Sequence, residues 1–308
     1  MSENLRSFLL KHKISGEDKK NGVLYTHTSV KPFKGSFFIE DKDLKEFYKI
    51  CKDDYISKDK ILYITEKPKD ASPLRIDFDF KFDFTQIMRN YDLELIKFVV
   101  SIHKKVINSC VKDANTLCIV MEKDMQKMGN GIVKDGIHFF YPHIVGSKAL
   151  LCAIREYAIK KMEKGKIMEK FKNAPTNKLA DIYDKCVLTR NNWTLYGGTI
   201  KTDEIPGKTL VYKATYIFDN DMENVLSNYT ETEIFDMTSL RLHQKVCKIK
   251  KKKKDYVVEL EQKMKQKPIN RRIKKENKRE AQEYKNIDKL RKLVSVSYTH
   301  LRAHETDS

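Results

Sequence analysis

Two acidic residues alternate with large apolar residues in the stretch RIDFDF, residues 75–80. Successive side chains of a β-strand point to opposite faces, so Asp77 and Asp79 share one face and the apolar residues share the other. Two neighbouring carboxylates on an otherwise buried strand repel each other and resist the loss of water. A divalent cation offsets that cost, so this stretch predicts a strand that holds a metal site.

The composition indicates a folded protein that does not span a membrane. Of the 308 residues, 40% are hydrophobic and 10% aromatic, which is typical of chains with a core. No apolar run approaches the length needed to cross a bilayer, and the first residues lack a signal-peptide pattern. Six scattered cysteines without a C-x-x-C pair predict thiols, not a zinc site or disulfides. We therefore expect a cytoplasmic or nuclear location and no membrane partner.

Positive charge is concentrated towards the end of the chain. The formal net charge is +18, and residues 241–294 hold 21 Lys or Arg against 7 Asp or Glu. Such density favours contact with a polyanion, of which nucleic acid is the commonest. A solvated linker that its own charge keeps extended explains the same pattern. Both interpretations stay open at this point.

The last residues do not resemble a structural element. The sequence VSYTHLRAHET, residues 296–306, is similar to one reading frame of a transposase-based sequencing adapter. We therefore interpret residues 295–308 as an artefact and leave them out of the fold. We expect the natural protein to continue beyond this point.

The order of predicted elements indicates an α+β fold. Pro73 separates an N-terminal α/β module, residues 1–73, from a catalytic module, residues 74–225. A basic helical linker follows over residues 226–294. Within the catalytic module we predict strands at 74–80, 116–121, 136–141 and 193–197, and helices at 91–111 and 147–163. This βαββαβ order is that of ferredoxin-like and RNA-recognition folds, in which the fourth strand flanks the first and helices cover one face.

The third predicted strand, in the sequence KDGIHFFYP, faces the acid pair. Its His138 and Gly136 share one face, and the topology places that face beside Asp77 and Asp79. Glycine here lets a ligand approach the backbone closely. Lys134 lies on the same face and can reach a phosphate.

A third carboxylate precedes the fourth predicted strand. Asp184 is followed by CVLTRNNWTLYGG, and a fourth strand that flanks the first brings Asp184 to Asp77 and Asp79. Three carboxylates can hold two Mg²⁺ or Mn²⁺ ions roughly 3.5–4 Å apart, the arrangement used for in-line nucleotidyl transfer.

The motifs D-F-D, K-D-G-I-H and an acid followed by V-L-T-R-N-N-W-T-L-Y-G together resemble the archaeo-eukaryotic primase superfamily. The chain is most similar, over about residues 20–220, to the primase portion of the primase-helicases of large nucleocytoplasmic DNA viruses. The resemblance implies a metal-dependent DNA primase or primase-polymerase. It also implies a single-stranded DNA template, nucleoside triphosphates, and a helicase domain in the full-length protein.

The resemblance further implies roles for individual residues. The metal ligands are Asp77, Asp79 and Asp184; the nucleotide contacts are Lys134, Gly136, His138, Arg190 and Lys201. Arg75 and Arg190 are equally compatible with surface ion pairs, and Trp193 with stacking on a base or with the core. Thr194 stands near the position where cellular relatives have an arginine, which leaves that phosphate contact in question.

A second class of function is compatible with the same topology. A non-catalytic nucleic-acid-binding module of the split βαβ fold would bind oligonucleotides without metal. A replication-initiator nuclease is disfavoured because the chain has no H-x-H motif. A glycosyltransferase with a DxD motif is disfavoured because such enzymes usually have a parallel sheet.

Overall fold

Two antiparallel sheets with helices around them make up the described part of the chain. The computed structural model describes residues 2–83, 88–127, 131–189, 192–199, 211–243 and 245–266. Residues 1–257 form one compact unit, and a second unit begins at Val258, of which residues 258–266 are helical. The mixed helix and sheet content confirms the predicted α+β class. None of the described helices is long and apolar enough to cross a bilayer.

The first sheet belongs mostly to the N-terminal part of the chain. Its strand order is β2 (Gly35–Phe37), β1 (His27–Ser29), β3 (Ile64–Glu66) and β8 (Trp193–Thr194). The neighbouring helices are α1 (Glu3–Lys11), α2 (Gly16–Lys20), α3 (Leu44–Asp54) and the 3₁₀ turn η1 (Ile56–Lys58). Fully buried side chains such as Phe37 and Phe47 fill the space between helices and strands.

The second sheet carries the acid pair. Its strand order is β4 (Ala71–Asp83), β7 (Ile132–Ser147), β5 (Cys118–Glu122) and β9 (Lys213–Phe218), with β6 (Gln126–Lys127) on β7. The alternation in the sequence is reproduced in β4, where Ile76, Phe78 and Phe80 are completely buried. The strands at 74–80, 116–121 and 136–141 were therefore predicted at the right places, and the third is longer than expected.

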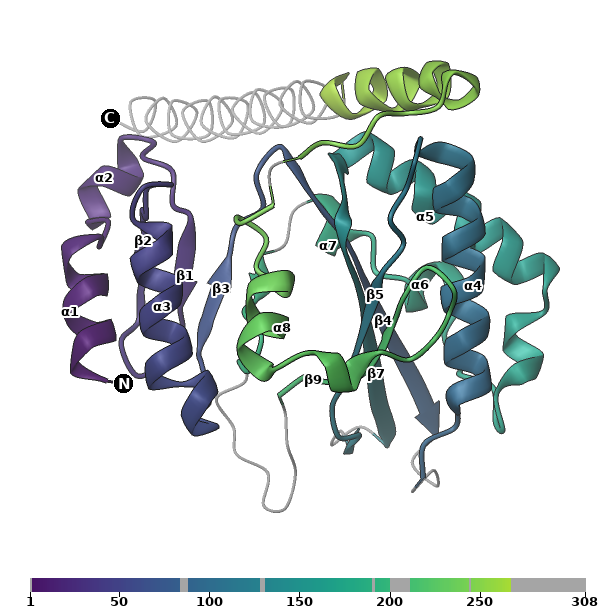
Figure 1. Cartoon of the computed structure of the whole chain (residues 1–308), viewed down its shortest axis with the longest axis horizontal. Helices are drawn as coiled ribbons and strands as arrows, with labels where there is room; N and C mark the ends of the chain where they lie inside the picture. The colour runs from purple at the N-terminus through teal and green to yellow at the C-terminus, as the bar shows by residue number, and fades with distance from the viewer. Residues whose placement is uncertain are drawn as a thin grey trace, which may run out of the picture. The chain divides into compact units, whose positions relative to one another are not determined.

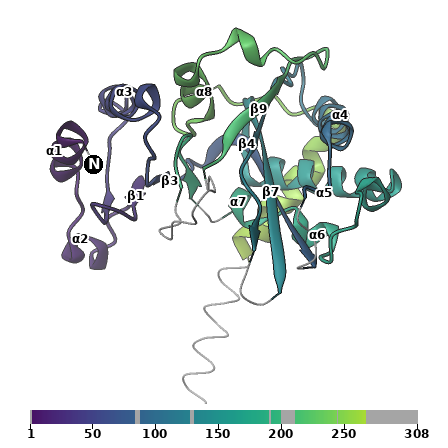
Figure 2. The same cartoon turned by 90° about the horizontal axis from the view of Figure 1, so that it is seen from below.

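The predicted long helices cover the apolar face of this sheet. Helices α4 (Leu93–Cys110) and α5 (Lys148–Lys164) lie side by side against it (Figures 1 and 2). Side chains of Asp92 and Ser147 cap their N-termini. The remaining short elements are η2 (Ile167–Lys170), α6 (Leu179–Ile182), α7 (Cys186–Thr189), η3 (Leu226–Asn228) and α8 (Glu231–Thr238).

The fourth predicted strand does not flank the first, so that prediction was wrong. Residues 193–194 pair with β3 of the other sheet, and β9 extends the main sheet beside β5. The edge of β4 is instead met by one bridge between Phe78 and Tyr183. The sequence pattern identified a strand but not its partner, because partners are chosen by contacts far apart in the chain.

Residues 226–257, which we assigned to the basic linker, pack within the first unit. Helix α8 lies between α3 and the main sheet (Figure 2). Farther along, Val246 bridges to Val145 and Ile249 bridges to Val111. The linker interpretation therefore does not fit this stretch. The six cysteines are free thiols, of which four are buried.

The buried Arg155 of α5 holds the segment that meets the edge of β4. Its guanidinium donates to the carbonyl of Tyr183 through Nε at 3.0 Å and Nη2 at 2.6 Å, and to that of Ala180 at 2.6 Å. Arg155 is 7% exposed and Tyr183 is completely buried, so the Tyr183 carbonyl has little access to water. The guanidinium thus fixes the residues that directly precede Asp184.

We expect Arg155→Leu to lower the free energy of unfolding by about 2–3 kcal/mol, because the buried Tyr183 carbonyl loses its charged donor. Urea unfolding measures this change. Hydrogen exchange of the Asp184 amide should also become faster, since that amide donates to β4. Lys160→Leu, at an exposed position of the same helix, is the matched control and should leave both quantities unchanged. Slow Asp184 exchange in Arg155→Leu would contradict the assignment.

Candidate active site

The pairing of β4 with β7 brings the acid pair to His138. In this register Asp77 lies opposite His138 and Asp79 lies opposite Gly136. Nε2 of His138 is 3.2 Å from Oδ1 of Asp77. The contact lacks hydrogen-bond alignment, so this buried oxygen has no hydrogen-bond partner among the described residues. The structure thus places His138 beside the acids, as the alternation in the sequence predicted.

The two carboxylates have different electrostatic environments. Burial opposes ionisation of Asp77, but His138 and Lys123 outweigh it and lower the pKa of Asp77. The pKa of Asp79 is raised by partial desolvation and then by the charge of Asp77. Burial also lowers the pKa of Lys123, although the nearby carboxylates act to raise it. The site therefore holds concentrated negative charge that is only partly balanced by neighbouring cations.

Aromatic rings fix the position of His138. The Tyr212 ring stacks on the imidazole at 3.4 Å between centroids, and the Trp193 ring lies at 4.5 Å. Trp193 is 5% exposed, so it belongs to the core around the site. The Tyr212 hydroxyl lies 2.6 Å from where a Cβ on Gly136 would be. The missing side chain of Gly136 therefore makes room for Tyr212, where we had expected a ligand.

Asp184 reaches β4 by a route that differs from the predicted one. The bridge between Tyr183 and Phe78 sets Asp184 opposite Asp77, and the Asp184 amide donates to the Asp77 carbonyl at 2.9 Å. Its carboxylate accepts a hydrogen bond from the Cys186 amide at 2.7 Å. Within the described residues no three His, Cys, Asp or Glu side chains converge as they do around a metal. The backbone of Asp184 is therefore at the site, while its carboxylate caps the next turn.

Of the other predicted nucleotide contacts, the structure describes some and leaves others outside the described residues. Lys134 lines an open pocket of about 290 Å³ together with Asp77, Asp79 and His138. Arg190 and Lys201 lie outside the described residues. Arg75 is completely buried and donates to Ser72 Oγ at 3.0 Å, and burial lowers its pKa to about 10. Arg75 is therefore neither a surface ion-pair partner nor a ligand contact in this conformation.

The sequence interpretation missed a charged network beside the pocket. Arg89 pairs with Glu122 and, through Nε at 3.1 Å, with Asp135, which is 1% exposed. The Tyr91 hydroxyl also donates to Glu122, at 2.9 Å. The position of Asp135 within K-D-G-I-H was a usable signal, but nothing in the sequence connects Arg89 to it. Lys123 and Tyr212 were missed for the same reason.

The donor set suits a hard divalent cation. Asp77 and Asp79 offer carboxylate oxygens on one face of one strand, the ligand type that Mg²⁺ and Mn²⁺ prefer. The buried Oδ1 of Asp77 has no hydrogen-bond partner among the described residues, which is what a position prepared for a cation predicts. The fit rests on these two residues, because the Asp184 carboxylate is engaged within its own loop.

Comparison with known proteins identifies the family of this chain. The family model described as the C962R protein N-terminal AEP domain, where AEP denotes archaeo-eukaryotic primase, matches residues 26–218. This match covers more than half of the chain and includes both sheets. The chain belongs to this family. The AEP domain thus contains the acid pair, His138 and Asp184 in one matched segment.

Two viral proteins are similar to this AEP domain. The protein named "Putative helicase L207/L206" of Acanthamoeba polyphaga mimivirus is 31% identical over 212 residues, 66% of this chain and 21% of the viral protein. The protein named "Putative helicase 184R" of Invertebrate iridescent virus 6 is 24% identical over 225 residues, 65% of this chain and 22% of the viral protein. The chain spans about a fifth of the length of these curated relatives.

We expect Arg89→Met to destabilise the AEP domain in a pH-dependent way. Burial already raises the pKa of Asp135, and without the guanidinium the folded-state value rises further. Stability then falls as pH climbs from the unfolded value, near 3.9, through the folded value. The free energy of unfolding should drop by about 1–3 kcal/mol at pH 7.5 and by less at pH 5.0, as measured by urea unfolding.

The matched control for this variant is Lys97→Met, which removes a cation from an exposed pair with Glu94. It should change the free energy of unfolding by less than about 0.5 kcal/mol at both pH values. A loss in Arg89→Met that is equal at the two pH values would show that the guanidinium acts by packing alone.

Proposed function

We propose that this AEP domain is a metal-dependent nucleotidyltransferase, a DNA primase or primase-polymerase that adds nucleotides on a single-stranded DNA template. One observation carries the proposal: the acid pair of β4 lies directly against His138 in an open pocket that lysines also line. Two adjacent carboxylates would weaken phosphate binding by a non-catalytic module, because they repel phosphate unless a cation lies between.

Asp77 and Asp79 are the residues that would hold Mg²⁺ or Mn²⁺. When bound, such ions activate the primer 3′-hydroxyl and neutralise the charge that develops on the transferring phosphate. The two acids are held for this task before any ligand arrives, because β4 is paired along its whole length with β7. Asp184 is the proposed third ligand, since its backbone is already at the Asp77 carbonyl; its carboxylate must leave the Cys186 amide to take part.

Two lysines and one histidine are suited to the triphosphate. Lys123 and Lys134 line the pocket with His138, and all three interact electrostatically with Asp79. Cations at this place attract the polyphosphate and partly neutralise it. The stacked Tyr212 ring holds the His138 imidazole in place, with Nε2 3.2 Å from the Asp77 carboxylate, so little side-chain freedom is lost on binding. We also propose that Lys201 and Arg190 contact the nucleotide.

The named relatives suggest the setting of this activity. Both viral proteins are named as helicases and are about five times as long as the matched segment. We propose that the full-length protein joins the primase to a helicase domain and acts in viral DNA replication. The primase domain would then act on the single strand that unwinding exposes.

We expect Asp77→Asn to abolish nucleotide incorporation on single-stranded DNA in the presence of Mn²⁺ or Mg²⁺, with a loss of at least about 100-fold. Labelled dNTPs and rNTPs, with and without a primer, measure extension and true priming separately. Asp70→Asn, an exposed acid just before β4, is the matched control and should keep full activity. Undiminished synthesis by Asp77→Asn would refute the proposal. Metal-independent DNA binding without synthesis by the wild type would instead favour the non-catalytic module.

Metal binding can be tested without catalysis. We expect Mn²⁺ to raise the thermal midpoint of the wild type, corresponding to about 2.7 kcal/mol at a concentration 100 times the dissociation constant. Asp79→Asn should lose this rise, yet it should be more stable than the wild type in EDTA because it relieves the repulsion with Asp77. Asp70→Asn should behave like the wild type in both conditions. An unchanged Mn²⁺ effect in Asp79→Asn would contradict the assignment of the ligands.

A further inference from the structure

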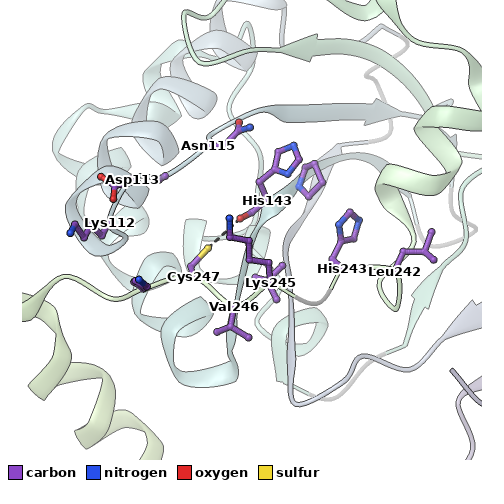
Figure 3. Close-up of a pocket in the computed structure, with 13 residues that line it drawn as sticks. Lys112, Asp113, Asn115, His143, Leu242, His243, Lys245, Val246 and Cys247 are labelled. Carbon is purple, nitrogen blue, oxygen red and sulfur yellow. Dashed lines mark hydrogen bonds between the residues drawn. The ribbon is translucent and has the colours of Figure 1, made fainter.

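A second and larger pocket lies at the other end of β7 from the acid pair. Its volume is about 560 Å³, and three parts of the chain line it: residues 112–115 after α4, residues 142, 143 and 145 of β7, and residues 242, 243 and 245–248. In the view of Figure 3, Lys112 lies at one end of the pocket and Leu242 at the other, with His143, Lys245 and His243 between them.

Backbone hydrogen bonds hold the walls of this pocket in place. The Lys112 amide donates to the Lys248 carbonyl at 2.8 Å, and the Cys247 amide donates to the Val145 carbonyl at 2.9 Å. The Cys247 thiol donates to the His143 carbonyl at 3.2 Å (Figure 3). Residues 247 and 248 are thus fixed across the ends of α4 and β7, and the pocket is formed before any ligand binds.

The charged side chains of the pocket favour an anion. Lys112, Lys245 and Lys248 are exposed, and none of them forms an ion pair with a described residue. Asp113 is the one acid among the residues that line the pocket. The chain continues directly into Lys250 and four further lysines, so the positive potential extends past the rim.

The remaining lining favours a nucleic-acid strand over a small anion. Leu242 is 40% exposed and Val246 is 55% exposed, and the exposed His143 lines the same pocket. Apolar and imidazole surfaces next to free lysines match bases that stack beside a phosphate backbone. A free phosphate needs only the lysines, and it would leave the apolar surface in water.

The second pocket and the acid pair both lie along β7. His138 and His143 are five residues apart on β7, which is at most about 16 Å along the strand. Between them, the Phe140 ring lies 6.1 Å from Trp193 on one side and 6.4 Å from His243 on the other. A length of single-stranded DNA on the order of five stacked nucleotides, at roughly 3.4 Å each, spans this distance.

We propose that the second pocket is a binding site for the phosphate backbone of single-stranded DNA, separate from the candidate active site. Lys112, Lys245 and Lys248 contact successive phosphates, and His143, Leu242 and Val246 contact the bases. The site holds the strand whether or not a metal or a nucleotide is bound at Asp77. Only the identification of the bound strand as a template rests on the proposed function.

The test compares two triple variants of the full 308-residue chain. Lys112→Gln, Lys245→Gln and Lys248→Gln together remove the pocket lysines. Lys11→Gln, Lys45→Gln and Lys60→Gln remove three exposed lysines of the N-terminal part, which form no ion pair with a described residue. Binding of a fluorescein-labelled 20-residue oligo(dT) is measured by polarisation in EDTA over a range of salt. The rest of the basic segment is identical in both variants, so the difference between them reports on the pocket.

We expect the pocket variant to bind oligo(dT) about tenfold or more weakly than the control at 0.1 M salt. Its slope of log K against log salt should be smaller by about 2, because three phosphate contacts at about 0.7 each are lost. An oligonucleotide that carries 5-iododeoxyuridine should also cross-link to the peptide that contains His143, and the pocket variant should lose this cross-link.

Equal affinities and equal slopes for the two variants would overturn the proposal. It would also be overturned if the pocket variant lost binding only to phosphatidylserine vesicles or to inorganic triphosphate and kept its binding to oligo(dT). Asp77→Asn should retain wild-type oligo(dT) binding in EDTA. Synthesis retained by Asp77→Asn would refute the active-site assignment alone, and oligo(dT) binding retained by the pocket variant would refute the second binding site alone.

Discussion

The continuous antiparallel pairing of β4 with β7 is the constraint on which the rest of the structure depends. Its register sets Asp77 opposite His138 and Asp79 opposite Gly136, and a shift by one residue would turn the acids into the apolar core. The completely buried Phe78 and Phe80 prevent that shift, because their rings pack against those of Tyr183 and Tyr91 in the core. The energy that specifies the site is therefore hydrophobic, although the site itself is charged.

The site is kept in an electrostatically costly state by its surroundings. Desolvation and the like charge of Asp77 raise the pKa of Asp79, and burial lowers the pKa of Lys123 nearby. The Arg89 pairs with Asp135 and Glu122 balance two further acids behind the pocket. Such concentrated charge is typical of sites that act on charged ligands, and it explains why the proposed cation and triphosphate suit this place. The second pocket continues the same strand with an excess of lysines instead of acids.

Much of this arrangement was predictable from local patterns, and the failures share one cause. The period-two alternation identified β4, its acidic face and the position of His138 beside it. The helical spacing of apolar residues identified α4 and α5. The fourth strand was assigned to the wrong neighbour, because residues 193–194 have the pattern of a strand but pair with β3. Arg89 and Tyr212 reach the site from distant segments, so no local sequence pattern predicts that they lie there.

The sequence by itself determined the element types, the α+β class and the shared face of Asp77 and Asp79, because each of these follows from the periodicity of a few neighbouring residues. The motifs also indicated the primase family, to which the chain belongs. Only the tertiary structure decided that Tyr183 occupies the edge of β4, that Arg75 is buried, and that residues 245–248 fold back to build a pocket. These outcomes depend on which surfaces come into contact when the chain folds. The burial of apolar residues that are far apart in the sequence determines those contacts.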